Sequence, residues 1–181
     1  LSTGIAVNTF GFSDDEWKNA VIEQLGKLQH TSNLYFSEPC TKLAQLLCEK
    51  TGMKKVFFSN SGAEANECAI KTARKYAADK KGSEYNTIVT LVNSFHGRTI
   101  TTLAATGQDV FHKDFLPLTQ GFVYAKANDI EDLTAKVKEN KCAAIMFECV
   151  QGEGGVLPLT KEFVEAIVKI AEENDLLVIC D

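Results

Sequence analysis

The sequence predicts an α/β fold in which a mostly parallel sheet is covered by helices on both faces, following an N-terminal helical segment. From residue 56 onward, short apolar runs alternate with stretches of helical periodicity. This alternation is typical of parallel strands that are joined by helices. Runs such as Cys142–Phe147 are apolar at every position, as expected of strands buried on both faces. Element order and strand composition therefore indicate the same fold class.

The composition is that of an ordinary globular protein of 181 residues, with 45% hydrophobic and 24% charged residues. We place residues 1–53 in an N-terminal segment and residues 54–181 in the region of alternating strands and helices, with a weak boundary near residues 52–55. The formal net charge of −5 argues mildly against nucleic acid or an anionic membrane as a partner. The six cysteines form no CxxC pair, and the N-terminus lacks the pattern of a signal peptide. We therefore expect a cytoplasmic protein with reduced thiols, no disulfide and no zinc.

The N-terminal segment is expected to contain two amphipathic helices. Gly4–Asn8 is interpreted as a short strand or extended arm, and Ser13 with Glu16 is expected to form a capping box before the first helix. The second helix is expected to start near Pro39 and to stop at Gly52. Apolar residues on one face of each helix are expected to pack: Trp17, Ala20, Val21, Leu25 and Leu28 in the first, and Leu43, Leu46 and Leu47 in the second.

The remainder of the chain alternates between strands and helices. The expected strands are 56–58, 87–92, 122–125, 142–147 and 176–181. The expected helices are 62–80, a short one after Arg98, 129–139, and 161–174 with Thr160 as its cap. In a parallel sheet of this kind, ligands bind at the carboxyl ends of the strands. Four segments with unusual chemistry follow strands directly: 59–63, 93–99, 148–155 and Asp181.

The segment Ser59–Glu67 joins the first predicted strand to a helix through small residues. Free N–H groups of a first helical turn converge at such a point, and the helix dipole favours an anion there. Gly62 lets a ligand approach the backbone, and Ser61 can add a hydroxyl donor. The alternative is a capped helix start without a ligand. This segment by itself favours neither of the two.

Four motifs, in order and at fitting distances, resemble those of the class III, fold-type I, pyridoxal-phosphate-dependent aminotransferases. They are Asn60–Glu67, Phe95–Thr99, Glu148–Val156 and a last strand that ends in Asp181. The resemblance covers the whole chain. It implies that residues 54–181 are the first half of the large cofactor-binding domain, truncated at the C-terminus. Residues 4–8 and 30–35 are most similar to the enzymes that use acetylornithine, whereas the ornithine and 4-aminobutyrate enzymes share the other motifs.

The resemblance implies cofactor contacts for five residues. Ser61, Gly62 and Ala63 would hold the phosphate of pyridoxal phosphate through backbone amides and one hydroxyl. Phe95 would lie against the pyridine ring; without the Gly-Arg that follows it, a core aromatic would be the better interpretation. Asp181 would sit under the pyridine nitrogen and keep it protonated. Its alternative is a helix N-cap or a loop aspartate.

Substrate binding is implied for three more residues. Arg98 would bind the substrate α-carboxylate through its planar fork, since a merely solvated arginine at a helix start would oppose the helix dipole. Glu153 resembles a family glutamate that pairs with a downstream arginine, outside this chain, and acts as a gate between two substrates. Otherwise Glu153 is an exposed loop carboxylate. Glu148 ends a buried strand, where a charge needs a partner, and we therefore assign it to the active site.

The activity that the resemblance implies is transfer of the terminal amino group of N-acetylornithine to 2-oxoglutarate, in arginine biosynthesis, by a homodimer when full length. An ornithine or 4-aminobutyrate aminotransferase is the competing enzyme, and a non-catalytic α/β domain that binds a phosphorylated ligand is the competing class. Cys149 replaces a common proline, and Phe36 replaces a more usual tyrosine. The cofactor-bearing lysine lies beyond the last predicted strand. The chain alone is therefore expected to bind the cofactor weakly and not to transaminate.

Overall fold

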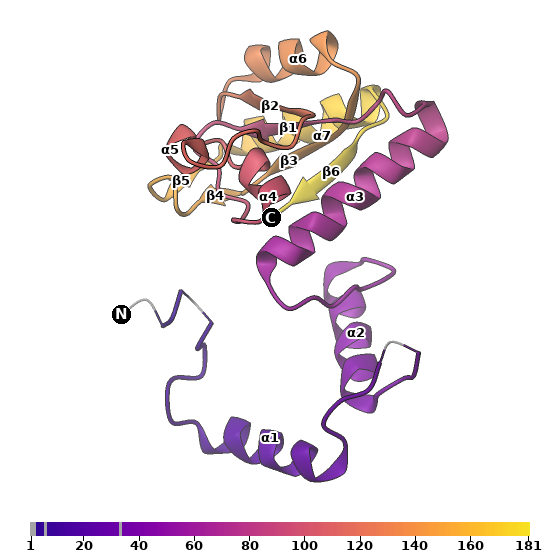
Figure 1. Cartoon of the computed structure of the whole chain (residues 1–181), viewed down its shortest axis with the longest axis vertical. Coiled ribbons are helices and arrows are strands. Elements are labelled where there is room, and N and C mark those ends of the chain that lie inside the picture. The colour runs from indigo at the N-terminus through magenta and orange to yellow at the C-terminus, as the bar shows by residue number, and fades with distance from the viewer. Residues whose placement is uncertain (1–2, 6, 33) are drawn as a thin grey trace. The chain divides into compact units, whose positions relative to one another are not determined.

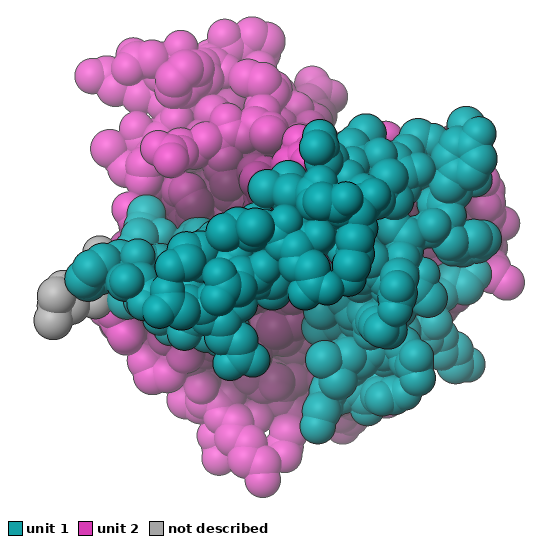
Figure 2. Space-filling model, turned by 90° about the horizontal axis from the view of Figure 1, so that it is seen from below, with its two compact units in different colours: residues 1–56 teal, residues 57–181 magenta. Residues whose placement is uncertain are grey.

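The structure, a computed structural model, describes residues 3–5, 7–32 and 34–181. The chain divides into two compact units, residues 1–56 and 57–181, which Figure 2 draws in teal and magenta. The division suggested by the sequence lies after residue 53. Each helix and each strand falls wholly within one unit, because the dividing point lies in an irregular stretch of chain.

The first unit begins with turns and with helix α1 (Asp15–Lys27). The Asp14 carboxylate caps this helix by accepting a hydrogen bond of 2.7 Å from the backbone N–H of Trp17. The predicted capping box of Ser13 and Glu16 is therefore wrong, and the cap lies one residue later. A carboxylate is a strong N-cap, since it satisfies a free N–H and also complements the positive end of the helix dipole.

Helix α2 (Glu38–Thr51) confirms the second predicted helix. Pro39 lies in its first turn, and Gly52 ends it in a left-handed conformation with φ +73°. Neither helix of this unit has a buried residue. Leu25 of α1 is 53% exposed, and Leu43 of α2 is 47% exposed. The packing predicted for the two apolar faces is therefore wrong within this unit, because two short helices offer too little surface to cover each other.

The stretch predicted to be a strand or an extended arm, residues 4–8, contains turns and no strand where the structure describes it. Gly4 adopts φ +67°, and the N–H of Asn8 donates a 2.9 Å hydrogen bond to the carbonyl of Thr3. A left-handed residue at this position turns the chain back on itself, so the predicted extended conformation is wrong. Residue 6 lies outside the described residues.

The second unit is built on a four-stranded sheet with the order β2–β1–β3–β6, in which every neighbouring pair is parallel (Figure 1). The strands are β1 (Thr87–Leu91), β2 (Phe122–Ala125), β3 (Cys142–Phe147) and β6 (Leu177–Cys180). All four were predicted, and the parallel sheet is confirmed. Strand β3 is buried at every position, which explains its uninterrupted apolar sequence.

Helices cover both faces of this sheet, as predicted. They are α3 (Gly62–Lys81), α4 (Ile100–Ala105), α5 (Asp109–His112), α6 (Ile130–Glu139) and α7 (Lys161–Glu173). On one face, Leu133 of α6 and Ile167 of α7 belong to a buried cluster with Ile145 of β3. On the other, Ile70 of α3 clusters with Ile88 of β1. Helix α5 was not predicted, since four residues are too few for a periodic signal.

Residues Val56–Phe58, predicted to be a buried strand, are irregular. Phe57 is 64% exposed, and no strand of the described residues pairs with this stretch. The strand prediction is wrong here because an apolar run becomes a strand only when a neighbour satisfies its backbone N–H and C=O groups. The segment 59–63 therefore follows an irregular stretch in this structure.

A short antiparallel hairpin, not predicted from the sequence, pairs β4 (Val150–Gln151) with β5 (Leu157–Pro158). Its turn is rich in glycine, and Gly155 adopts φ +118°. Val156 follows with φ +56°, a left-handed conformation in which a β-branched residue is an outlier. The hairpin carries Glu153 in its turn.

Candidate functional site

A hollow of about 310 Å³ lies where the parallel strands end. Its walls come from the start of α3, the loops after β1 and β3, the hairpin and the residue after β6. The lining residues are Gly62, Ala63, Asn66, Phe95, His96, Gly97, Glu148, Val150, Gly152 and Asp181. The structure thus brings together most of the predicted site residues at the carboxyl edge of the sheet, where ligands bind in folds of this class.

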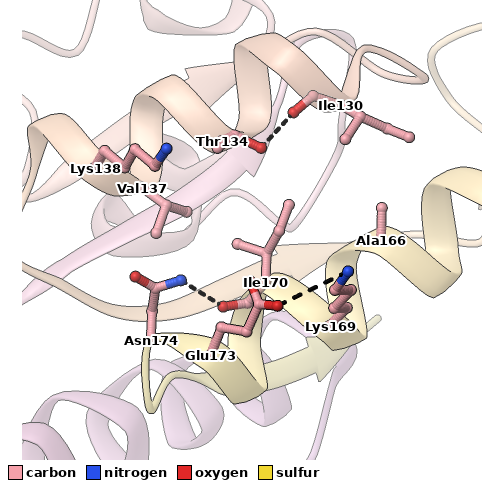
Figure 3. Close-up of a pocket in the computed structure, with 9 residues that line it drawn as sticks. All are labelled: Ile130, Thr134, Val137, Lys138, Ala166, Lys169, Ile170, Glu173 and Asn174. Atoms are coloured by element: carbon pink, nitrogen blue, oxygen red, sulfur yellow. Dashed lines mark hydrogen bonds and ion pairs between the residues drawn. The ribbon is translucent and has the colours of Figure 1, made fainter.

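A second hollow, of about 340 Å³, lies between α6 and α7 (Figure 3). Its walls are largely apolar, and most of its polar groups serve the two helices themselves. Lys169 pairs with Glu173 at 3.9 Å, and the Asn174 side chain donates a 2.8 Å hydrogen bond to the carbonyl of Ile170 (Figure 3). No predicted site residue lines this hollow. The candidate site is therefore the hollow at the carboxyl edge of the sheet.

Helix α3 begins at this hollow with a cap. The Ser61 hydroxyl accepts a 3.2 Å hydrogen bond from the N–H of Glu64, and the Glu64 carboxylate accepts one of 2.6 Å from the N–H of Asn60. Within the part of the chain that the structure describes, the N–H groups of Gly62 and Ala63 have no acceptor. A Cβ built on Gly62 would meet nothing within 4 Å. The capped turn thus leaves open amides that are suited to an anion.

Asp181, at the end of β6, is held by two side chains. Its Oδ2 accepts a 2.8 Å hydrogen bond from Nδ2 of Asn66 and lies 2.8 Å from Nδ1 of His96. Burial acts to raise the pKa of Asp181, but the hydrogen bonds from His96 and Asn66, with the charge of His96, bring this pKa below its ordinary value. Since both contacts fall on Oδ2, Oδ1 is without a partner among the described residues and is available to a cationic N–H.

His96 and Asn66 are site residues that the sequence reasoning missed. The His96 side chain is 0% exposed, and its Nε2 has no hydrogen-bond partner in the described part of the chain. Asn66 also donates a 2.9 Å hydrogen bond to the backbone carbonyl of His96. The available signals were spacings: Asn66 follows Gly62 by four residues on α3, which places both on one helix face, and His96 adjoins Phe95.

Glu148 and Phe95 both line the hollow and are joined by a hydrogen bond. The N–H of Phe95 donates a 3.0 Å hydrogen bond to Oε2 of Glu148. Burial raises the pKa of Glu148 above its ordinary value, although the Phe95 N–H and the charge of His96 act in the opposite direction. The Phe95 ring packs edge-on against Phe111, with centroids 5.6 Å apart, and is only partly buried. Glu148 therefore has the partner that a charge at the end of a buried strand requires.

Arg98 and Glu153 do not line the hollow. Both residues are exposed, and no hydrogen bond or ion pair joins either side chain to the residues that the structure describes. Their neighbours Gly97 and Gly152 do line the hollow, so both residues adjoin its lining along the chain, and we refer to Arg98 and Glu153 as the rim residues. Ser61 also lies outside the lining, as the cap of α3. The ligand-binding roles of Arg98, Glu153 and Ser61 remain predictions.

The residues of the hollow fit pyridoxal phosphate. The open amides of Gly62 and Ala63 match a phosphate. The partly exposed ring of Phe95 offers an aromatic surface, and the ionised carboxylate of Asp181 matches a protonated pyridine nitrogen. The buried Nε2 of His96 leaves one further polar atom unsatisfied at this wall. The amides are thus complementary to the phosphate of a phosphorylated pyridinium, and the Asp181 carboxylate is complementary to its ring nitrogen.

An α/β unit with open amides at a helix start and an aspartate at a strand end is compatible with a phosphorylated cofactor, and the comparisons with known proteins identify the family. The family model "Aminotransferase class-III" matches residues 1–181, so the chain belongs to the class III aminotransferases. The solved structure of the ornithine aminotransferase from Toxoplasma gondii matches with a TM-score of 0.93 and 26% identity. The match covers 99% of this chain and 43% of that one, and it confirms the predicted fold class.

Two curated relatives match almost the whole chain at higher sequence identity. The chain is 52% identical over 181 residues to the acetylornithine aminotransferase of Haemophilus ducreyi, of which it covers 46%. It is 44% identical over 178 residues to the succinylornithine transaminase of Salmonella heidelberg, of which it covers 43%. The chain therefore spans about half the length of the curated relatives that it matches. Among the described residues, no helix combines the length and the apolar character needed to cross a membrane.

Proposed function

We propose that the protein to which this chain belongs is a pyridoxal-phosphate-dependent aminotransferase that moves the terminal amino group of N-acetylornithine to 2-oxoglutarate, in arginine biosynthesis. The observation that carries the proposal is Asp181, held by Asn66 and His96, in the same hollow as the open amides of α3. The 52% identity to an acetylornithine aminotransferase over the whole chain supports this amino donor.

Cofactor binding falls to the start of α3, Phe95 and Asp181. When bound, pyridoxal phosphate draws electrons from the reacting carbon of the substrate through its protonated ring. Asp181 keeps the proton on the ring nitrogen, since a neighbouring carboxylate favours the charged form. The amides of Gly62 and Ala63, with the hydroxyl of Ser61, bind the phosphate. Phe95 holds the ring face by stacking that contributes about 1 kcal/mol beyond burial.

Substrate binding falls to the rim. Both proposed substrates carry an α-carboxylate, and Arg98 binds it through two parallel N–H groups. Glu153 acts as a gate: it pairs with the downstream arginine that the family resemblance implies, screens that arginine for the amino donor and releases it for the second carboxylate of 2-oxoglutarate. Glu148 holds the backbone of Phe95 and so keeps the aromatic surface in place. The two half-reactions then share one carboxylate anchor and differ at Glu153.

The test of the carboxylate anchor is Arg98→Lys in the full-length enzyme. Lysine keeps the charge but loses the bidentate geometry, so KM should rise for both substrates, with a loss of about 2–4 kcal/mol in transition-state binding. Arg74→Lys is the matched control, because Arg74 donates to the backbone carbonyls of Asn86 and Gln120 and does not line the hollow. Unchanged kinetics for Arg98→Lys would overturn this role.

The amino donor is tested separately. The names of similar proteins include succinylornithine transaminase and ornithine aminotransferase, so both donors should be assayed beside N-acetylornithine and 4-aminobutyrate. A higher kcat/KM for any other donor would replace N-acetylornithine in the proposal. A full-length protein that binds pyridoxal phosphate but transfers no amino group would instead be a phospholigand-binding domain.

Two further parts of the proposal concern the intact protein. We propose a homodimer, as the family resemblance implies, in the cytoplasm, as the scattered cysteines suggest. Sedimentation of the full-length protein, together with cell fractionation, tests both. A monomer that retains full activity would remove the dimer from the proposal.

A further inference from the structure

The first turns of α3 hold the loop that carries Arg98. Asn66 donates to the carbonyl of His96 at 2.9 Å. Gly97 lies so close to the helix that an added Cβ would come within 2.8 Å of the Cβ of Ala63. One helix thus contacts both residues that precede Arg98, and the same helix begins with the open amides described above.

On the other side of Arg98, Thr99 is tied to the same helix. Its hydroxyl donates a 2.6 Å hydrogen bond to Oε1 of Glu67, and both side chains are partly buried. A hydrogen bond to an ionised carboxylate is among the strong kinds. Thr99 also caps α4 in a capping box with Thr102, whose hydroxyl lies 2.7 Å from that of Thr99. The carboxylate of Glu67 therefore orients a hydroxyl that in turn starts α4.

The Arg98 side chain has no partner of its own among the described residues, so its position depends on its backbone. That backbone is fixed before Arg98 by Gly97 against Ala63, and after Arg98 by Thr99 on Glu67. Loss of the Glu67 contact would release the backbone that follows Arg98, while the backbone before it stays held. A guanidinium that must meet a carboxylate with two N–H groups tolerates little displacement, because both of its parallel N–H···O bonds depend on distance and angle.

We propose that Glu67 is a positioning residue, whose carboxylate holds Thr99 and thereby sets Arg98 at the geometry that binds the α-carboxylate of both substrates. The inference rests on the proposed function, because it assumes that Arg98 binds a carboxylate. Glu67 does not line the hollow, and its effect passes through Thr99 and the loop. It also links the helix whose amides face the phosphate to the loop that faces the substrate.

The experiment uses the full-length enzyme loaded with pyridoxal phosphate. Glu67→Ala should raise KM about tenfold for both substrates while kcat and the cofactor's absorbance change little. Glu67→Gln should recover most of the loss, because its side-chain carbonyl can still accept from Thr99. Lys71→Ala, four residues further along the same helix and exposed, is the matched control and should leave KM unchanged.

A general loss of structure would behave differently. Single turnover with a primary amine that lacks a carboxylate should be unaffected by Glu67→Ala, because Arg98 then has nothing to bind. In a Thr99→Val background, Glu67→Ala should add no further increase in KM. Equal losses with and without a carboxylate on the amine, or additive effects with Thr99→Val, would overturn the positioning role.

The result also separates this inference from the proposed function. If Arg98→Lys raises KM while Glu67→Ala does not, only the positioning role of Glu67 fails. If Arg98→Lys itself leaves KM unchanged, the carboxylate anchor fails and the inference fails with it.

Discussion

The two sides of the candidate site are built differently. On the inner side, Asn66, His96 and Asp181 contact one another in a partly buried network. On the rim, Arg98 and Glu153 are exposed and without partners in the described part of the chain. In the proposed reaction the inner groups serve one cofactor throughout, whereas the rim must accept two substrates in turn. The difference teaches that a side chain with one permanent ligand can be fixed by its neighbours in advance, whereas the side chains of Arg98 and Glu153 are left for the substrates to order. For Arg98 it is the backbone on either side that is held.

The largest effect on stability should come from the inner side, at Gly97. Its φ is +125°, and an added Cβ would approach Thr102 Oγ1 to 2.7 Å and Ala63 Cβ to 2.8 Å. Gly97→Ala should therefore lower the free energy of unfolding by about 2–4 kcal/mol, from overpacking and backbone strain.

Gly62→Ala is the matched control, since a methyl group there meets nothing. Its stability should change by less than about 1 kcal/mol, while affinity for pyridoxal phosphate falls if the cofactor phosphate contacts that backbone. Urea unfolding of full-length Gly97→Ala and Gly62→Ala measures the two stabilities, and titration with pyridoxal phosphate measures the affinity. Equal stabilities would mean that the inner side is no more tightly built than an exposed helix start.

The second effect concerns Asp181 and should depend on pH. The pKa of Asp181 is lowered in the folded protein, so its contribution to stability is present above the unfolded pKa of about 3.9 and is lost as pH falls through the folded pKa. Asp181→Asn should cost about 1–2 kcal/mol at pH 7, and the difference from wild type should shrink on acidification. Unfolding at a series of pH values checks this, and a difference independent of pH would contradict it.

Glu148 should show a smaller effect of the opposite sign. Its folded pKa is raised by burial, so the stability linked to it is present below the unfolded pKa of about 4.3 and is lost as pH rises through the folded pKa. Glu148→Gln keeps an acceptor for the Phe95 N–H and removes that loss. We expect a gain below about 1 kcal/mol at pH 7 and none at pH 4. A loss at pH 7 would show that the charge itself is needed.

The smallest effect on stability should come from the rim. Glu153→Gln should change the free energy of unfolding by less than about 0.5 kcal/mol, as is usual for exposed positions. In separate single-turnover assays, however, it should favour 2-oxoglutarate over the amino donor, because the downstream arginine with which Glu153 is proposed to pair would be left free. Equal effects on the two half-reactions would make Glu153 a structural residue and remove the functional contrast between rim and interior.

Local patterns predicted the sheet and its helices well, because apolar runs and helical periodicity can be recognised within a short stretch of sequence. The apolar run Cys142–Phe147 is buried throughout, and Thr160 caps α7 as predicted. Patterns failed where a partner decides the outcome. Val56–Phe58 has the composition of a strand but pairs with none among the described residues. The hairpin was missed because each of its strands has only two residues.

The inner network could not be read from the sequence for the same reason. Asn66 and Asp181 are 115 positions apart, and His96 and Asp181 are 85 apart. Apart from its four-residue spacing from Gly62, nothing near Asn66 distinguishes it from other polar residues on a helix. Only the parallel sheet, which brings the ends of β1 and β6 to one edge, puts the three side chains in contact. The roles of the exposed residues Arg98 and Glu153 rest on the family resemblance.

The left-handed Val156 has a consequence for the hairpin that carries Glu153. A valine at φ +56° is held away from its preferred backbone conformation, at a cost of about 1–3 kcal/mol, and it is 72% exposed, so no surrounding side chains enclose it. The two pairs of β4 and β5 and the hydrogen bond from the Val156 N–H to the Gly152 carbonyl oppose its relaxation. The strained backbone at Val156 is therefore held by only two strand pairs and one backbone hydrogen bond, so a change that weakens either is expected to loosen the turn that carries Glu153.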